Sequence, residues 1–314
     1  MGARWRDLAG PVGRLAPGAR NAITDVPGVL VGHAQAASGE RTGVTVVVPP
    51  ALPLAAGVAT VNGVGELIGY LEVTERGVIE TPVHLCGTHA VGTVAHAAVL
   101  ASGRGPDDVV IPIVGECDDG SMADSRTVTV EDVERARAAA GFDVPEGSVG
   151  AGTGMTCFDF PGGIGTASRV VGDRHVGVLL LCNFGDRERL AVLDLEPARD
   201  KRESHGSCIA LCATDAPLDA HQLRRLALRP LLGLSRAGSY AGEGSGEIGL
   251  AFSTSTAAGR LTHRELNPYF AAAYEAAEEA VYNCLVAARP ARRLDGVMQD
   301  AFPLDAVRTR AAAP

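Results

Sequence analysis

Continuous apolar runs, each closed by turn residues, recur along the 314-residue chain. The runs are short and rich in Val, Ile and Leu, which is typical of β-strands. Because apolar residues are continuous rather than alternating with polar ones, we expect these strands to be covered on both faces. The predicted strands are 42–49, 108–117, 175–185, 207–218 and 247–256.

The segments between these runs contain candidate helices. The last one begins well, because Asn267 can cap it and Pro268 suits a first helical position. Strands and helices intermix along the whole length, which indicates an α/β or α+β protein with layered helices. No repeat or Pro/Ser-rich linker divides the sequence, so we predict one domain over 1–314. The predicted helices are 63–75, 88–101, 130–140, 218–234 and 267–288.

Composition argues against several classes of partner. The formal net charge is −9, and no basic stripe suited to phosphate binding is present. No run reaches the roughly 18 to 20 apolar residues of a membrane helix, and the polar N-terminus lacks the apolar region of a secretion signal. We therefore expect no nucleic-acid or membrane partner, and a cytoplasmic protein.

Neither metal nor cofactor patterns stand out. The seven cysteines are scattered without a C-x-x-C pair, mostly inside apolar runs, where a thiol behaves as a small hydrophobe. The eight histidines show no H-E-x-x-H or similar ligand spacing. The glycine-rich stretch 148–156 lacks the ending of a phosphate loop and is interpreted, like 160–169, as a tight turn. We expect no disulfide, metal or cofactor.

A glycine-rich loop, RAGSYAGEGSG at 236–246, precedes the last predicted strand and contains a candidate nucleophile, Ser245. The nucleophile elbow of α/β-hydrolases does not fit, because the serine is out of register in G-x-S-x-G and a strand follows instead of a helix. Two interpretations stay open on the residues alone. Ser245 is either a turn residue entering a strand or an N-terminal nucleophile.

The second interpretation has a physical basis in the preceding glycine. The Ser245 hydroxyl would attack the carbonyl carbon of Gly244, and hydrolysis of the resulting ester would leave serine as a new N-terminus. Glycine has no Cβ to block that approach, and it tolerates a strained backbone. The freed α-amine, with a pKa of about 7.7 to 8.0, can act as general base near neutral pH. Nucleophile and base then belong to one residue, so no histidine is needed.

The segment GEGSGEIGLAFST resembles the nucleophile segment of the DmpA-type aminopeptidases, the family of L-aminopeptidase/D-esterases and β-aminopeptidases. The order and number of further similar blocks make the resemblance strong. These blocks are NAITDVPGVLVGH, TGVTVVVP, NGVGELIG, ETPVHL, GAGTGM, GGIGTASR, GVLLLCNFG, ATDAPL and EEAVYN.

The resemblance implies an αββα sandwich, shared with the ornithine acetyltransferases, and a homo-oligomer. It also implies self-cleavage between Gly244 and Ser245 into chains of residues 1–244 and 245–314 that stay together. The implied activity is removal of an N-terminal residue from short peptides, amino-acid amides or esters.

The resemblance further implies roles for individual residues. Ser245 would be the nucleophile, and Asn183 would donate to the oxyanion hole. Glu279 would be a carboxylate near the nucleophile that orients the α-amine or stabilises its protonated form. The alternative for Glu279 is that it meets water, on a helical face that it shares with Glu275 and Asn283.

Glu116 and Asn62 are the predicted substrate-binding residues. Glu116, at the end of the strand 108–117, would hold the free amine of the substrate. Asn62 would donate to the site or merely cap a helix. The sequence departs from the family pattern at Ser121, where an aromatic is expected, and at Ala277, where a hydroxyl residue is common; these departures concern substrate preference.

Two other functions stay open. A self-cleaving acyltransferase, similar to the ornithine acetyltransferases, would have this architecture but typically uses threonine as nucleophile. An unprocessed, non-catalytic oligomeric relative would keep the fold without the cleavage.

Overall fold

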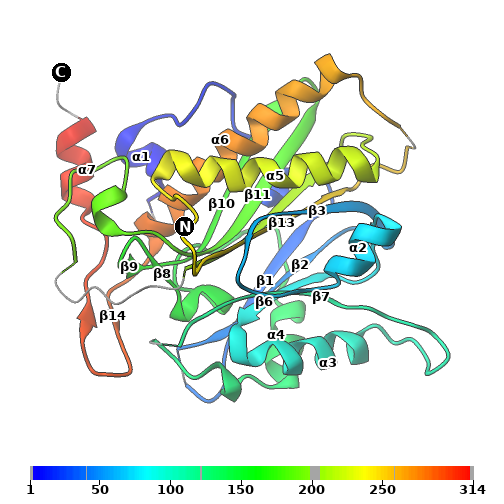
Figure 1. Cartoon of the computed structure of the whole chain (residues 1–314), viewed down its shortest axis with the longest axis horizontal. Helices are drawn as coiled ribbons and strands as arrows, with labels where there is room; N and C mark the ends of the chain where they lie inside the picture. The colour runs from blue at the N-terminus through cyan, green and yellow to red at the C-terminus, as the bar shows by residue number, and fades with distance from the viewer. Residues whose placement is uncertain (1–2, 40, 121, 199–205, 258, 312–314) are drawn as a thin grey trace.

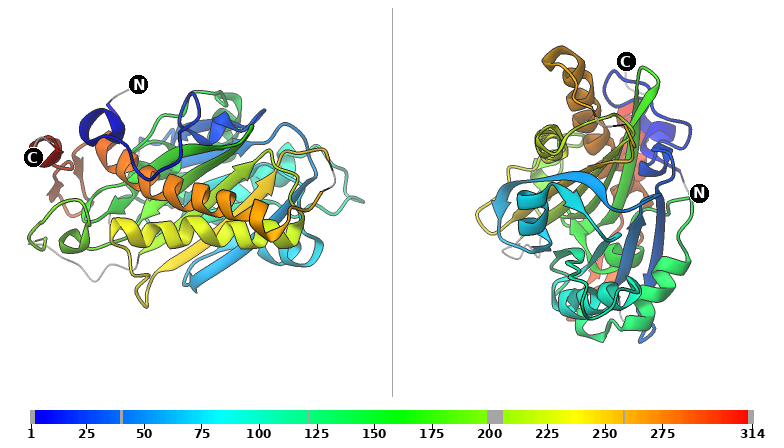
Figure 2. Two further views of the ribbon diagram at one scale, coloured as in Figure 1. Left: turned by 90° about the horizontal axis from the view of Figure 1, so that it is seen from above. Right: turned by 90° about the vertical axis from the view of Figure 1, so that its right-hand side faces the viewer.

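The computed structural model describes residues 3–39, 41–120, 122–198, 206–257 and 259–311; Ser121 lies outside them. Two β-sheets pack face to face, and helices cover the outer face of each (Figures 1 and 2). The predicted αββα sandwich is confirmed.

The larger sheet carries three of the predicted strands in its centre. Its strands are antiparallel to their neighbours except for β12 and β13, which run parallel. In spatial order they are β10 (Gly163–Val171), β11 (Arg174–Asn183), β12 (Ser207–Thr214), β13 (Gly246–Ser253), β3 (Leu54–Gly63) and β5 (Val78–Ile79).

The smaller sheet contains the other two predicted strands. The strand expected over 108–117 is confined to Ile113–Cys117, and it pairs in parallel with β6. In spatial order the strands are β1 (Leu30–Gln35), β2 (Gly43–Val48), β6 (Val83–Gly87), β7 (Ile113–Cys117) and β4 (Leu67–Ile68).

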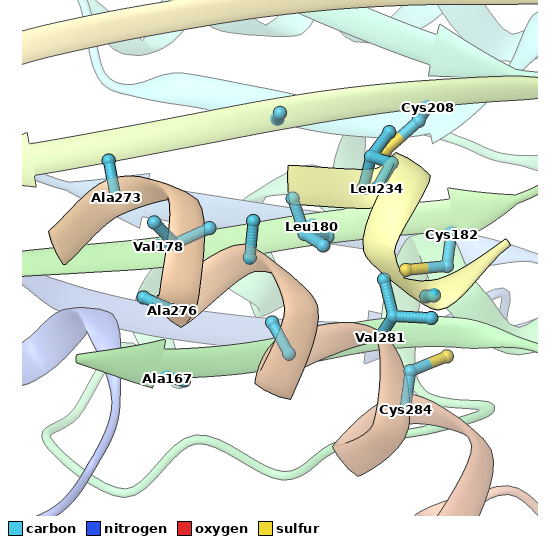
Figure 3. Close-up of a cluster of buried hydrophobic side chains, with 14 of the residues drawn as sticks. Ala167, Val178, Leu180, Cys182, Cys208, Leu234, Ala273, Ala276, Val281 and Cys284 are labelled. Atoms are coloured by element: carbon cyan, nitrogen blue, oxygen red, sulfur yellow. The ribbon is translucent and has the colours of Figure 1, made fainter. Parts of the chain in front are cut away.

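Alternate residues of the central strands enter two different cores. In β11, Val178, Leu180 and Cys182 belong to the cluster beneath the helices α5 (Ala220–Ala237) and α6 (His263–Ala287) (Figure 3). Leu179 and Leu181 point the other way, into the core between the sheets. Burial on both faces explains why this strand is apolar at successive positions, as the sequence predicted.

Helices α5 and α6 lie side by side over the larger sheet (Figure 2). The predicted start of α6 was wrong. Thr262 is the N-cap: its hydroxyl accepts from the backbone N–H of Glu265, whose carboxylate accepts from the backbone N–H of Thr262. Asn267 is therefore not the cap, and Pro268 lies inside the helix.

The helices outside the smaller sheet agree with their predicted positions. They are α3 (Val91–Ala101) and α4 (Val130–Ala138), which cover the core formed with β2, β6 and β7. The helix predicted over 63–75 was only partly right, because α2 spans only Tyr70–Arg76 and the residues before it include the end of β3 and all of β4.

The glycine-rich stretches have different structures. A 3-10 helix at Gly150–Gly154 fits the expected turn at 148–156, but 160–169 was not a turn, since much of it forms β10. A Cβ at Gly165 would lie 1.9 Å from the Ala280 carbonyl oxygen, so glycine in β10 allows α6 to approach the sheet.

The remaining helices and strands are short. No helix among the described residues combines the length and apolar character needed to cross a bilayer. The short elements are α1 (Trp5–Ala9), α7 (Leu304–Ala311), β8 (Thr156–Cys157), β9 (Phe160–Pro161), β14 (Ala291–Arg292) and β15 (Met298–Gln299).

Candidate active site

Ser245 directly precedes β13, at the end of a tight turn. Its backbone N–H donates to the carbonyl of Gly242 at 2.9 Å, so Glu243 and Gly244 form the centre of the turn. Two residues of the loop 236–246 have a left-handed backbone, Gly238 with φ 118° and Ala241 with φ 52°. The bond between Gly244 and Ser245 thus joins a surface turn, in which Glu243 is exposed, to a buried strand.

Asn62 holds this turn from the neighbouring strand. Its Nδ2 donates to the carbonyls of Gly242 at 2.7 Å and Glu243 at 3.3 Å. Asn62 lies opposite Glu247 in the β3–β13 pair, next to a register shift of the bulge type, an irregularity that often re-aims side chains beside active sites. Asn62 contacts the turn and does not cap a helix, because the next helix begins only at Tyr70.

Glu247 is the direct partner of the candidate nucleophile. The Ser245 hydroxyl donates to Glu247 Oε1. Two positions apart in an extended chain, the two side chains share one face. Only 6% of Ser245 and 1% of Glu247 is exposed. Burial raises the pKa of Glu247, and the hydrogen bond from Ser245 opposes that rise.

The second oxygen of Glu247, Oε2, is buried and has no hydrogen-bond partner in the part of the chain that is described. An unsatisfied buried acceptor is uncommon in folded proteins and calls for an explanation. The sequence analysis did not single out Glu247. The available signal was the Ser-Gly-Glu spacing at the start of a strand, which places the hydroxyl and the carboxylate together.

A cavity of about 120 Å³ opens beside Ser245, formed between the turn and the ends of β11 and β12. It is large enough to hold water molecules or a small organic group. Its lining residues are Phe184, Gly185, Asp186, Gly206, Ser239, Tyr240, Ala241, Gly242, Glu243, Gly244 and Ser245.

Asn183, at the end of β11, lies level with the start of β13 across the intervening strand β12. It pairs with Ser207, which pairs with Gly246. With strands about 4.8 Å apart, the backbones of Asn183 and Gly246 are about 10 Å apart. Asn183 Nδ2 donates to the Asp118 carbonyl at 2.9 Å and to Ser207 Oγ at 3.3 Å, and its Oδ1 accepts from the Thr156 backbone N–H at 2.9 Å.

Glu116 reaches the start of β13 from the smaller sheet. Its Oε1 accepts from the Glu66 backbone N–H at 2.8 Å, and its Oε2 accepts from the Thr88 hydroxyl. A Cβ at Gly65 would lie 3.3 Å from Glu116 Oε1 and 3.9 Å from Gly246 Cα, so the carboxylate and the start of β13 both lie close to this glycine. Burial raises the pKa of Glu116, and both hydrogen bonds oppose that rise.

Glu279 has a different set of partners. Its side chain is fully buried and accepts from Arg6 at 2.6 and 2.7 Å, from Arg169 at 2.8 Å and from Asn21 Nδ2 at 2.5 Å. Asn283, on the same helical face, is also buried, at 1% exposure. The alternative that this face meets water was therefore wrong, because it packs on the N-terminal segment and β10.

These partners place Glu279 near the other end of the larger sheet. Arg169 pairs with Val176, whereas Asn183 is the last residue of β11. At about 3.4 Å per residue, these two positions of β11 are about 24 Å apart. The structure brings Ser245, Asn62, Asn183 and Glu116 to one end of the two sheets, and it does not bring Glu279 there.

In the described ranges, no three His, Cys, Asp or Glu side chains gather in a way that could hold a metal ion. All seven cysteines are buried.

The chain matches the model of Peptidase family S58 over residues 21–299. The beta-peptidyl aminopeptidase BapA of Sphingosinicella microcystinivorans is 40% identical, over 96% of this chain and 90% of that relative. A solved beta-aminopeptidase from Burkholderia sp. superposes with a TM-score of 0.90 and 37% identity, over 99% of this chain and 100% of the other.

A second solved structure links this fold to a catalytic class. It is the L-aminopeptidase D-Ala-esterase/amidase of Ochrobactrum anthropi, described as a prototype of the serine aminopeptidases and a variant of the Ntn hydrolase fold. It superposes with a TM-score of 0.88 and 34% identity, over 98% of this chain and 97% of the other.

Proposed function

We propose, from the premise that this chain belongs to peptidase family S58, that it cuts its own Gly244–Ser245 bond and then uses Ser245 as its nucleophile. Family membership makes the protein a hydrolase and an aminopeptidase of the N-terminal-nucleophile class. The observation that carries the assignment to Ser245 is the buried contact between its hydroxyl and a carboxylate, directly after a surface turn.

The products of the cut would be residues 1–244 and 245–314. They are expected to stay together, because β13 of the short chain pairs with β12 and β3 of the long chain in the middle of one sheet. The cytoplasmic location and the homo-oligomer expected from the sequence are part of this proposal.

After the cut, Ser245 would supply both nucleophile and base. Its hydroxyl oxygen attacks the substrate carbonyl while its α-amine, with a pKa of about 7.7 to 8.0, accepts the proton and later returns it to the leaving group. Asn183 would stabilise the oxyanion. Its contact with Ser207, at 3.3 Å, is the longer of its two donated hydrogen bonds and so the one more readily exchanged for a developing negative charge.

Glu116 would bind the free amine of the substrate, as an aminopeptidase requires. Glu116 is 5% exposed and lies next to Gly65, close to the start of β13. Its described hydrogen-bond donors are a backbone N–H and a hydroxyl, so neither of them is a cation that would compete with the substrate amine. Asn62 would keep the turn at 242–245, here called the cleavage turn, in position. We propose short peptides, amino-acid amides and esters as substrates.

The test is hydrolysis of an aminoacyl p-nitroanilide and of its N-acetylated analogue. The wild-type protein should release nitroaniline from the free-amine substrate only, and Ser245→Ala should be inactive. Release from both compounds would contradict an aminopeptidase. Preferential acyl transfer to an added amine over water would indicate the acyltransferase alternative. A folded, uncut wild-type protein without activity would contradict the proposal altogether.

A further inference from the structure

The self-cut requires a base that the finished enzyme does not need. The α-amine of Ser245 becomes available only when its bond to Gly244 is broken. Before that, the same nitrogen belongs to a peptide bond, where its lone pair is delocalised, and it donates to the Gly242 carbonyl at 2.9 Å. The first attack on the Gly244 carbonyl therefore needs another group to accept the hydroxyl proton.

We infer that Glu247 is this group, and that it accepts the Ser245 hydroxyl proton during the self-cut. A general base must lie within hydrogen-bond reach of the proton that it removes, and Glu247 Oε1 already accepts from the Ser245 hydroxyl. Glu247 has this role only if the proposed self-cut occurs.

The surroundings of Glu247 favour proton acceptance. Burial is the largest influence on its pKa and raises it, and a carboxylate with a raised pKa is a stronger base. None of the titratable groups on the neighbouring elements contributes to that shift. The titratable groups that these elements place near the start of β13 are Cys208 on β12, Tyr240 and Glu243 in the loop 236–246, Glu116 on β7, and Arg236 near the end of α5, which is paired with Glu278.

The reaction balances with water as the only co-reactant. The Ser245 O–H bond breaks, its proton moves to Glu247 Oε1, and Ser245 Oγ bonds to the carbonyl carbon of Gly244. The tetrahedral intermediate then collapses: the C–N bond breaks, and Glu247 returns the proton to the leaving nitrogen of Ser245. Water hydrolyses the resulting ester to a Gly244 carboxylate and the free Ser245 hydroxyl.

The unpaired oxygen of Glu247 fits the product of this sequence. Oε2 is buried without a partner among the described residues, although its companion Oε1 is occupied by the hydroxyl. The α-amine released by the cut belongs to the same serine as the hydroxyl that contacts Glu247, so the covalent geometry of that residue keeps it near this carboxylate. Oε2 is therefore the acceptor available to the new N-terminus.

The test compares Glu247→Gln with Glu134→Gln in the full chain. Glutamine keeps the size and an acceptor oxygen of Glu247 but does not take up a proton at neutral pH. Glu134 is an exposed carboxylate on α4, away from the site, so its substitution by glutamine is the matched control. The fraction of uncut chain is followed by intact-mass spectrometry after synthesis. We expect Glu247→Gln to slow cutting by about 10²- to 10⁴-fold, the usual contribution of a general base, and Glu134→Gln to cut at the wild-type rate.

The dependence of the cutting rate on pH separates a base from a merely structural residue. The wild-type rate should be constant at high pH and fall as pH drops through the raised pKa of Glu247, because protonation removes the acceptor. The rate of Glu247→Gln should instead rise about tenfold per pH unit, because hydroxide must then take the proton. A structural defect would lower the rate equally at every pH.

The outcomes distinguish this inference from the proposed function. If the wild-type protein cuts itself and Glu247→Gln cuts at the same rate, the role of Glu247 is overturned, while the proposed function is not. A wild-type protein that never cuts would overturn both. If Glu247→Gln does not fold, the wild-type pH profile still decides, since a rate without an acid limb above the ordinary glutamate pKa contradicts Glu247 as the base.

Discussion

Two buried glutamates near opposite ends of the larger sheet differ in their partners. Glu279 is surrounded by donors: two arginines and an amide contact its two oxygens. In Glu247, Oε1 accepts from one hydroxyl, and Oε2 has no hydrogen-bond partner among the described residues. A buried carboxylate with complete pairing is a structural element, whereas an incompletely paired one beside a nucleophile is available for proton transfer.

The partners of Glu279 also show what it connects. Arg6 comes from α1 and Arg169 from β10, while Glu279 itself belongs to α6. Arg169 is fully buried, and burial lowers its pKa, while the charge of Glu279 opposes that effect. Glu279 therefore ties the N-terminal segment and the helix layer to the sheet. Its predicted place beside the nucleophile is taken by Glu247.

The largest effect should follow from breaking the Glu279 cluster. Glu279→Gln leaves the buried Arg169 without its nearest charged partner, with only Glu275 at 3.5 Å, so we expect the free energy of unfolding to fall by about 3 to 5 kcal/mol. Denaturant unfolding measures this change. The exposed Glu134→Gln on α4 is the control and should shift stability by at most about 0.5 kcal/mol. A stable Glu279→Gln protein with slowed self-cutting would reverse the assignment of the two glutamates.

A slightly smaller effect is expected at the other end, from Asn183→Ala. Loss of one oxyanion donor should lower kcat about 10²- to 10³-fold, or about 2.7 to 4 kcal/mol, with little change in KM. Steady-state kinetics on the cut protein measure both constants. A rise in KM with kcat unchanged would show that Asn183 binds substrate without stabilising the transition state.

Glu116→Gln should affect substrate binding. Loss of a hydrogen bond to a charged amine, about 1.5 to 3 kcal/mol, should raise KM about 10- to 150-fold. In the wild type, kcat/KM should fall as pH drops through the raised pKa of Glu116, because the protonated carboxyl no longer attracts the amine. The variant should lack this acid limb. An unchanged KM and pH profile would remove Glu116 from the substrate site.

The smallest effect should come from Asn62→Ala, which removes the support of the cleavage turn. One neutral hydrogen bond contributes about 1 kcal/mol, so the self-cut should slow by about fivefold while stability changes little. Time-resolved intact mass measures the rate, as for Glu247→Gln. A complete block would mean that Asn62 takes part in the chemistry itself.

Much of the fold could be predicted because its pattern is local. The strands β11, β12 and β13 are buried on both faces, so their continuous apolar runs mark them. The start of α6 was missed because its capping box, Thr262 with Glu265, lies in a polar stretch before the apolar pattern begins. β10 was missed because its Gly165 allows a close contact with α6 that the local sequence does not reveal.

The site was predictable where one segment carries it. Ser245 and its glycines are adjacent in sequence, and their chemistry follows from that adjacency. The cluster of Glu279 was not predictable, because Arg6 and Arg169 lie 273 and 110 residues away along the chain. Glu247 was close enough in sequence to be found, but its role depends on the extended backbone that puts it on the face of Ser245.

The central claim is that the chain cuts itself before Ser245, and the N-terminus of the short chain tests it most directly. Intact-mass spectrometry of the purified 32.2 kDa protein, with sequencing of each N-terminus, should find two chains, the shorter one beginning at Ser245. A single uncut chain, or a short chain that begins at another residue, would contradict the account.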